Sequence, residues 1–385
     1  MTADPRDRLD DAAALEASDP SDMLRAVATS AAQIRASLAA VQEAPLTALG
    51  LDARPRAVVV AGMGGSGISG EVLATLCAAA CPVPVVVHRG FSLPGWVGAA
   101  DLVIAVSCSG TTAETLSSAN EAARRGTRLL GVGAADSPLD DQCRSARGAY
   151  VPVTMQLAPR SSMWALVVPL LVVAERAGLL GLGASFADLE AAASRLESIA
   201  SACRPDLELF VNPGKALAAE LLGTLPMIWG SGEVGPVAAL RTACQLMENA
   251  KAPALWGALP EAHHNQSVAL DGSLAVPTGS ATDDDDFFRD RVEEQEPLRL
   301  RLVLARDDRG APDAAARADA SAEVARARGV AVSAVTAEGD SAIERLASLV
   351  GLLDFASVYL ALASDIDPTP IGPIVDLKAR LAARG

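Results

Sequence analysis

The chain has 385 residues, which is enough for two or three domains. Lys and Arg total 32 and Asp and Glu total 47, so the formal net charge of −15 argues against a nucleic-acid binder, which normally carries a basic surface. Hydrophobic residues make up 50% and charged residues 21%, which is a globular composition and not that of a disordered chain.

Targeting and redox signals are sparse. No uninterrupted stretch of about 18 apolar residues is present, so a membrane span is not expected. The N-terminus is acidic and polar, unlike a secretory signal. The six cysteines stand singly without a CxxC pair, and we expect a reduced, cytoplasmic protein. With only three histidines in the chain, a zinc site built from histidines and thiolates is not expected.

The first half of the chain alternates between short apolar runs and helical patterns. Residues 5–45 are predicted to be helical, because their apolar residues recur on one face, and a break follows at 50–55. The alternation beyond that break is typical of a parallel sheet with helices on both faces. The predicted strands are Ala57–Ala61, Pro84–His88, Leu102–Val106 and Leu129–Val132, and the predicted helices are Gly67–Ala79, Thr112–Arg125, Ser161–Leu180 and Ala184–Ala202.

The same pattern repeats in the second half. We therefore predict an α/β fold of two tandem units, each with three layers (helices, parallel sheet, helices). An N-terminal helical segment would cover residues 1–45, the first unit 46–180 and the second unit 181–385. The predicted strands are Met227–Trp229, Leu300–Leu304 and Val330–Val335, and the predicted helices are Lys215–Leu222, Pro236–Ala250, Ala314–Arg328, Ser341–Ala363 and Gly372–Ala383.

A glycine-rich loop, Gly62–Gly67 (GMGGSG), directly follows a predicted strand and opens a helix. Glycines let the backbone approach a phosphate, and the free N–H groups of a helix N-terminus can bind it. The loop matches GxGxxG, but a dinucleotide-binding unit expects an acidic residue about 20 positions later. None stands in residues 84–89. Arg89 in that stretch could serve a 2′-phosphate, so an NADP-dependent reductase stays open as an alternative.

A hydroxyl-rich loop, Ser107–Thr115 (SCSGTTAET), also lies between a predicted strand and a predicted helix. One hydroxyl is enough to cap a helix, and capping alone is the simpler interpretation. Several hydroxyls beside the free N–H groups of a helix N-terminus instead favour a phosphate site. The hydroxyl side chains of this loop are Ser107, Ser109, Thr111, Thr112 and Thr115.

At this point the sequence resembles the sugar isomerase (SIS) domain family, and most closely its bifunctional phosphoglucose/phosphomannose isomerases. The likeness covers about residues 20–385 and keeps the motifs in one order. The segments that carry it are GMGGSGISG (62–70), HRGFSLPGWV (88–97), SCSGTTAET (107–115), APRS (158–161), IWGS (228–231), MENAKAP (247–253), LPEAHHN (259–265) and DPTPIGPIVDLK (367–378).

The resemblance implies an isomerase that interconverts glucose 6-phosphate or mannose 6-phosphate with fructose 6-phosphate through a cis-enediol, without metal or cofactor. Glu248 would move the proton between carbons 1 and 2, and Arg160 would stabilise the enediolate. Lys378, and His264 from the second subunit of a homodimer, would help to open the sugar ring. The phosphate would lie in the two loops, against Gly65, Ser66, Ser107, Ser109, Thr111 and Thr112.

The residues themselves allow simpler interpretations. Glu248 closes a helix with a predicted apolar stripe, and it could pair on the surface with Lys251. Arg160 follows Pro159, which stiffens its turn, but it could be an ordinary arginine at a helix entry. The stripe on the helix of Glu248 comprises Val237, Leu240, Cys244 and Met247.

His264 and Lys378 also allow simpler structural interpretations. His264 titrates near neutral pH and can move a proton to a ring oxygen, but it could equally be a surface or structural histidine. His263 beside it is given no catalytic role. Lys378 could be the solvated flank of an amphipathic helix. The apolar stripe of that helix comprises Ile371, Ile374, Leu377 and Leu381.

Two features depart from the family pattern. Residues 271–297 form an acidic insertion, which is longer than most connections in a compact domain. Gln266 stands where an acid is common in the family, which affects how His264 would be oriented. These departures leave open a second function, a sugar-phosphate sensor without turnover. A DNA-binding regulator and an amidotransferase-type synthase are not expected, because no basic helix-turn-helix and no N-terminal cysteine nucleophile is visible.

Overall fold

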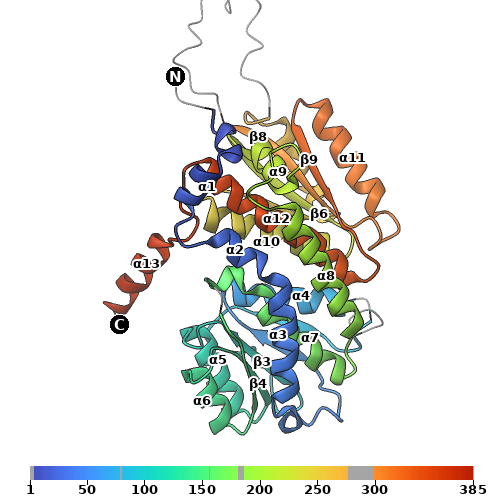
Figure 1. Ribbon diagram of the computed structural model, residues 1–385. Helices are drawn as coiled ribbons and strands as arrows, with labels where there is room; N and C mark the ends of the chain where they lie inside the picture. The colour runs from blue at the N-terminus through green and yellow to red at the C-terminus, as the bar shows by residue number, and fades with distance from the viewer. Residues whose placement is uncertain (1–3, 79, 156, 181–185, 276–297, 385) are drawn as a thin grey trace, which may run out of the picture.

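The computed structural model describes residues 4–78, 80–155, 157–180, 186–275 and 298–384. Two parallel sheets, one in each lobe of the molecule, are flanked by helices (Figure 1). The predicted fold class, two successive α/β units with parallel sheets, is therefore confirmed.

The first sheet has the strand order β2-β1-β3-β4-β5, and all of its neighbouring strands are parallel. Strand β3 is buried along its whole length, which explains its continuous apolar run. Strand β5 had not been predicted, because its four residues end in a proline and give too short a pattern. The strands are β1 (Val58–Ala61), β2 (Val85–His88), β3 (Leu102–Ser107), β4 (Arg128–Gly133) and β5 (Ala149–Pro152).

Helices cover both faces of this sheet. One of them, α6, had also not been predicted; Ser137 caps it by accepting a hydrogen bond from the N–H of Asp140, and Pro138 takes its first position. The helices of the first lobe are α4 (Gly64–Cys77), α5 (Ala113–Arg124), α6 (Pro138–Ser145) and α7 (Met163–Arg176), and a 3₁₀ turn, η3 (Pro159–Ser161), precedes α7.

The second sheet has the order β7-β6-β8-β9, again fully parallel. The edge strand β7 had not been predicted. Its four residues show no pattern of burial, since Leu255 and Trp256 are exposed by 50% and 42%. The strands are β6 (Thr224–Ser231), β7 (Leu255–Ala258), β8 (Arg299–Arg306) and β9 (Ala331–Thr336). The helices are α8 (Phe186–Ala202), α9 (Pro213–Leu221), α10 (Gly235–Asn249), α11 (Ala314–Ala327), α12 (Ala342–Ala363) and α13 (Gly372–Ala382), with 3₁₀ turns η4 (Glu261–His264) and η5 (Gln266–Asp271).

The N-terminal segment is helical but broken into short pieces. The carboxylate of Asp19 accepts hydrogen bonds from the N–H groups of Met23 and Leu24, and Asp22 has a left-handed backbone with φ of +63°. Together these residues stop one helix and start the next. The pieces are η1 (Asp7–Asp10), α1 (Ala12–Ser18), α2 (Met23–Ala28), α3 (Ser30–Glu43) and η2 (Leu46–Leu49).

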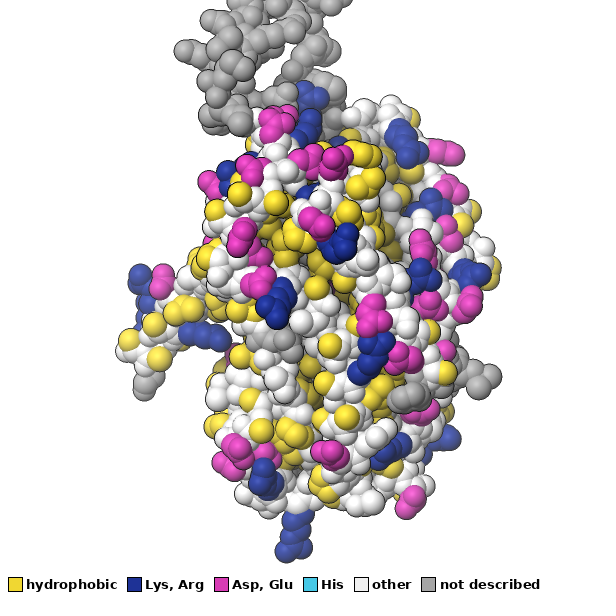
Figure 2. All heavy atoms as spheres, viewed as in Figure 1, with side chains coloured by type: hydrophobic (Ala, Val, Ile, Leu, Met, Phe, Trp, Pro, Cys, Tyr) yellow, Lys and Arg dark blue, Asp and Glu magenta, His cyan; other side chains and the backbone are white. Residues whose placement is uncertain are grey.

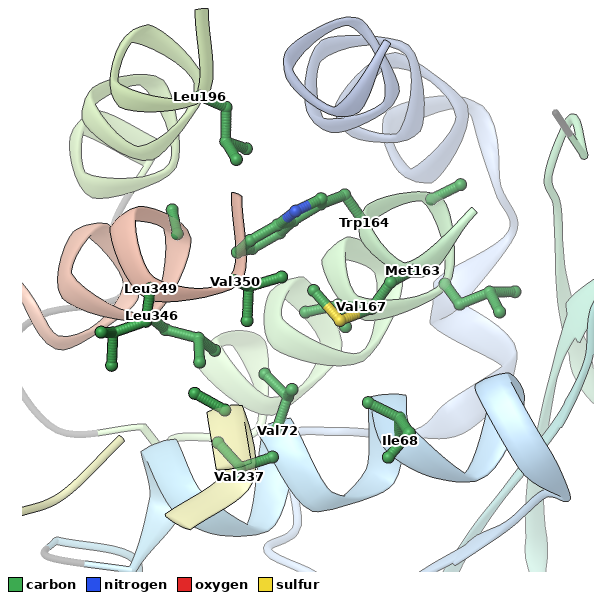
Figure 3. Packing of buried hydrophobic residues seen from close by; sticks show 14 of the residues in the cluster. Ile68, Val72, Met163, Trp164, Val167, Leu196, Val237, Leu346, Leu349 and Val350 are labelled. Atoms are coloured by element: carbon green, nitrogen blue, oxygen red, sulfur yellow. The ribbon is translucent and has the colours of Figure 1, made fainter. Parts of the chain in front are cut away.

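One hydrophobic core runs through both lobes. Trp164 on α7 and Val350 on α12 lie next to each other, and Val72 on α4 and Val237 on α10 belong to the same buried cluster (Figure 3). The lobes therefore share buried apolar surface, and the helices between them are fixed relative to one another.

Helix α12 is the central element of that core. By length and composition it could cross a membrane, but 94% of its most apolar window is buried inside the fold. Its buried polar residue Asp354 is ion-paired with Arg241 of α10. These features identify α12 as a core helix of the second lobe.

Helix α13 stands away from the body of the molecule (Figure 1), and Figure 2 shows hydrophobic side chains on its surface. None of its residues is buried, so the predicted apolar stripe does not face a core within the protomer. Ile374, Leu377 and Leu381 are exposed by 41%, 59% and 60%.

Candidate active site

The glycine-rich loop connects β1 to α4 at the carboxyl end of the first sheet. Ser66 is 6% exposed, and its hydroxyl accepts a hydrogen bond from the N–H of Cys108 at 3.2 Å. This bond ties the glycine-rich loop to the hydroxyl-rich loop after β3. The two predicted phosphate loops therefore lie side by side at the carboxyl end of the first sheet.

The hydroxyl-rich loop is held by its own side chains. Ser107 Oγ donates to Thr112 Oγ1 at 3.0 Å and accepts from the Thr112 N–H at 3.4 Å, and the hydroxyls of Ser109 and Thr111 are 2.9 Å apart. Thr112, the N-cap of α5, makes no capping bond to the helix amides. Capping by Thr112 therefore does not account for these hydroxyls, and α5 receives no side-chain cap from this residue.

Arg160 joins the first lobe to the second. Its guanidinium is 3% exposed and lies with Nη1 3.5 Å from a carboxylate oxygen of Glu248 on α10. Its Nε donates to Asn249 Oδ1 at 2.6 Å, and its Nη2 donates to the carbonyls of Pro368 and Thr369 at 2.7 and 3.0 Å. The arginine is therefore held in one orientation, with one N–H edge turned to Glu248.

The glycine-rich loop touches this arginine turn. A Cβ at Gly65 would lie 3.3 Å from the Pro159 carbonyl oxygen and 3.5 Å from the Arg160 backbone nitrogen. A side chain at position 65 would press against this turn. Gly65 is therefore next to Arg160, and Arg160 is next to Glu248. We call these three residues the wall beside the phosphate loops.

The electrostatics of this wall are dominated by burial. Burial lowers the pKa of Arg160, and the carboxylates of Glu248 and Asp367 act in the opposite direction. Burial likewise lowers the pKa of Lys251, with Arg160 contributing in the same direction. An arginine remains charged at neutral pH even so, because its ordinary pKa lies above 12. The site therefore holds a fixed cation close to one carboxylate.

Glu248 does not pair with Lys251 through its side chain. The Lys251 ammonium instead donates to the backbone carbonyl of Glu248 at 2.7 Å and to that of Pro368 at 3.0 Å. The carboxylate of Glu248, 31% exposed, stays turned to Arg160. The predicted surface pair is therefore not present.

The predicted apolar stripe of α10 is wrong in part, because Met247 is 46% exposed. The helix instead buries a polar row, Arg241, Gln245 and Asn249, against α12. Arg241 and Gln245 bond to Asp354, and Asn249 donates to Ser357 Oγ at 2.9 Å. Sequence reasoning missed Asn249 and Lys251, although both stand inside the MENAKAP motif.

His264 and Lys378 do not reach this wall within the protomer. His264 ends η4 and is exposed, and Lys378 is exposed on α13. Among the contacts of the described residues, none joins either side chain to Arg160 or Glu248. The sequence-predicted site is therefore only partly brought together in one chain.

The neighbours of His264 have structural roles. His263 Nε2 lies 2.8 Å from Ser321 Oγ and its ring meets Trp229 edge-on, so giving it no catalytic role agrees with its packing. Gln266 accepts from Trp229 Nε1 at 2.7 Å and donates to the Trp256 carbonyl at 3.0 Å. Gln266 therefore supports β7 and does not orient His264. The acidic segment lies outside the described residues from 276 to 297.

Comparison with known proteins agrees with these motifs. Residues 210–381 match the family described as bacterial phospho-glucose isomerase C-terminal SIS domain. The bifunctional phosphoglucose/phosphomannose isomerase of Caldicellulosiruptor bescii is 28% identical over 326 residues, covering 84% of this chain and 89% of that protein. The chain is therefore similar to these isomerases over most of its length. The protein of the same description from Aquifex aeolicus is also 28% identical, over 85% of this chain and 90% of its own length.

Solved structures support the fold. The tagatose-6-phosphate ketose/aldose isomerase of Escherichia coli superposes with a TM-score of 0.64 at 13% identity, covering 90% of this chain and 92% of that one. The C-terminal domain of glucosamine-fructose-6-phosphate aminotransferase from Francisella tularensis gives 0.65 at 15% identity, over 90% and 98%. The tandem arrangement of two parallel sheets is therefore shared with these proteins.

Proposed function

We propose that the protein is an aldose–ketose isomerase that interconverts glucose 6-phosphate, mannose 6-phosphate or both with fructose 6-phosphate. The observation that carries the proposal is the Arg160 guanidinium, 3.5 Å from the Glu248 carboxylate beside the two phosphate loops. Isomerisation needs a base at the carbon next to a carbonyl and positive charge near the developing enediolate. The names of the relatives described above support the same reaction.

Each residue has a defined step in the proposed mechanism. Glu248 removes the proton from carbon 2 of the open-chain aldose, while oxygen 1 gains a proton, which gives a cis-enediol. Oxygen 2 then loses its proton and Glu248 returns the first proton to carbon 1, which gives the ketose without net gain or loss. Arg160 offsets the negative charge between these steps. The hydroxyls of the second loop hold the phosphate.

A homodimer would complete the site. His264 is exposed on its own protomer, next to the exposed side chains of Trp256 and Val268, which are 42% and 71% accessible. An exposed apolar surface beside an unused histidine is suited to contact with a second copy of the chain. In this proposal His264 enters the partner's site and opens the sugar ring there, and Lys378 assists.

The decisive experiment is a coupled assay of purified protein after treatment with EDTA, with glucose 6-phosphate and mannose 6-phosphate tested separately. Formation of fructose 6-phosphate from at least one of them is expected, and the ratio of the two kcat/KM values gives the preference. If neither sugar phosphate is converted, the proposal is wrong.

The base is tested by Glu248→Gln, which keeps the shape of the side chain but not the proton acceptor. We expect kcat to fall by about 10²- to 10⁴-fold, the usual range for a general base. Glu323→Gln, at an exposed position on α11, is the matched control and should keep full activity. Full activity in Glu248→Gln would remove Glu248 from the mechanism.

The partner contribution of His264 is tested by mixing two inactive variants, Glu248→Gln and His264→Ala, under conditions that exchange subunits. A mixed dimer then has one intact site, so random exchange should restore about a quarter of the wild-type activity. No recovery, with subunit exchange verified, would place His264 and Glu248 in the same chain.

A sugar-phosphate sensor is the second candidate. It is favoured by the separation of His264 and Lys378 from Glu248 within the protomer. Calorimetric binding of fructose 6-phosphate without conversion of either aldose phosphate would establish the sensor in place of the enzyme.

A further inference from the structure

One cation at the edge of the first sheet takes no part in the mechanism described so far. Arg89 directly follows β2, which pairs with β1, and the N–H of Gly62 donates to the neighbouring His88 carbonyl at 3.2 Å. The backbone of Arg89 therefore lies beside Gly62, the first residue of the glycine-rich loop.

The side chain of Arg89 lies along the first turns of α4. Its Nε is 3.1 Å from where a Cβ of Gly67 would stand, and its Nη1 pairs with Glu71 Oε1 at 2.8 Å. Any side chain at position 67 would displace the guanidinium, so Gly67 makes room for Arg89. The arginine side chain remains 40% exposed, and it therefore stays accessible to a ligand.

Arg89 also faces the helix that carries Glu248. Helix α4 contacts α10, and Cys244 lies one turn before Glu248 on α10. Burial raises the pKa of the Cys244 thiol, Glu248 adds to that effect, and Arg241 and Arg89 oppose it. Arg89 and Glu248 are therefore both close enough to Cys244 to affect its pKa, in opposite directions.

The sheet order fixes which part of a substrate Arg89 can meet. In the order β2-β1-β3, Arg89 and the hydroxyl-rich loop lie on opposite sides of β1. Neighbouring strands are about 4.8 Å apart, so two spacings give about 10 Å between them. A six-carbon sugar phosphate can extend over such a distance. With its phosphate in the hydroxyl-rich loop, a hexose phosphate that extends across β1 would bring its carbon 1 end toward Arg89.

We propose that Arg89 is a further substrate-binding residue, which contacts the oxygens at the carbon 1 end of an open-chain hexose 6-phosphate. This inference rests on the proposed function. A planar guanidinium suits two adjacent sugar oxygens or a carboxylate, and Glu71 holds it in place through one N–H.

The test compares two ligands that differ at that end. Inorganic phosphate needs only the two phosphate loops, whereas 6-phosphogluconate also carries a carboxylate at carbon 1. In Arg89→Gln, calorimetry should show affinity for 6-phosphogluconate at least tenfold weaker and affinity for phosphate unchanged within about twofold. Arg89→Lys should recover part of the loss, because it keeps the charge but not the fork.

Arg309→Gln is the matched control, since Arg309 is an exposed arginine that follows the second sheet and pairs with Asp340 at 2.9 Å. It should leave both affinities unchanged. Equal weakening of the two ligands in Arg89→Gln, or no weakening of either, would overturn the assignment. If the wild-type protein binds 6-phosphogluconate but converts neither aldose phosphate, the proposed isomerase fails while the Arg89 result still decides the present inference.

Discussion

The two lobes differ at the carboxyl ends of their sheets, where the N-terminus of a helix can interact with a negative charge. In the first lobe, the loop after β3 carries several hydroxyls, and Thr112 makes no capping bond to the N-terminus of α5. In the second lobe, Asp307 stands directly after β8 and is fully buried. Its carboxylate accepts from the N–H groups of Glu233 and Val234 at the start of α10, both at 3.1 Å.

An arginine completes this internal arrangement. Arg345 on α12 donates to Asp307 at 2.9 Å and pairs with Glu233 at 3.0 Å. A carboxylate of the chain thus takes the position at the helix N-terminus that an anion takes in other proteins. The comparison teaches that a repeated unit can keep its strand–loop–helix geometry while one lobe fills the helix N-terminus with its own carboxylate and the other leaves it without a side-chain cap.

The largest effect is expected in the first lobe. The double variant Ser109→Ala/Thr112→Val removes two hydroxyls that would donate to the phosphate, each worth about 1.5–3 kcal/mol to a charged group. We expect kcat/KM to fall by about 10²- to 10⁴-fold, with the loss mainly in KM. A change in kcat alone would show that these hydroxyls do not hold the phosphate.

The corresponding change in the second lobe should act on folding. Asp307→Ala removes the fully buried carboxylate that pairs with Arg345 and uncaps α10, so we expect the free energy of unfolding to drop by about 3 kcal/mol. Urea denaturation measures this loss. Inorganic phosphate should restore part of it, and the wild-type response to phosphate is the control. A stable Asp307→Ala protein would contradict the structural role.

Two carboxylates, one in each lobe, should contribute to stability with opposite pH dependence. The hydrogen bonds from Arg144 hold the pKa of Asp140 in the first lobe below its ordinary value of 3.8, although burial opposes them. This contribution to stability is present above pH 3.8 and is lost as the pH falls further. Burial instead raises the pKa of Glu233 in the second lobe above 4.5, so its contribution declines as the pH rises from 4.5.

Unfolding free energies across this pH range separate the two effects. Asp140→Asn should be less stable than wild type at neutral pH, and the difference should shrink in acid. The unfolding free energy of Glu233→Gln should increase relative to that of wild type as the pH rises above 4.5. Parallel changes in the two variants would contradict the comparison.

The smallest effect is expected at Ser231, which ends β6 in the second lobe. Its hydroxyl is buried and has no hydrogen-bond partner among the described residues. Ser231→Ala removes an unsatisfied polar group, so stability should stay within about 1 kcal/mol of wild type or rise. A large loss of stability would show that this hydroxyl has a structural role in the loop after β6.

Sequence reasoning found the local features and missed the distant ones. The two phosphate loops are short, contiguous and placed directly after buried strands, so their pattern was visible. Asn249 and Lys251 could not be recognised in this way, because the groups that define them, Ser357 and the Pro368 carbonyl, lie 108 and 117 positions further along the chain. Arg160 and Glu248, 88 positions apart, were assigned to one site only through the family resemblance, and their contact is seen only in the structure.

Exposure explains the other differences. Helix α13 carries apolar side chains that the single protomer leaves in solvent, and periodicity alone assigns such residues to a core. The polar row on α10 shows the reverse case, in which Arg241 is buried because Asp354 pairs with it at 2.6 Å.

The continuous core has a consequence for how the protein unfolds. Since Trp164, Val72, Val237 and Val350 pack in one cluster (Figure 3), neither lobe can lose its helices without exposing the interior of the other. Heat or denaturant should therefore melt both halves in a single cooperative step. A sugar phosphate gripped by one half would then protect the whole chain.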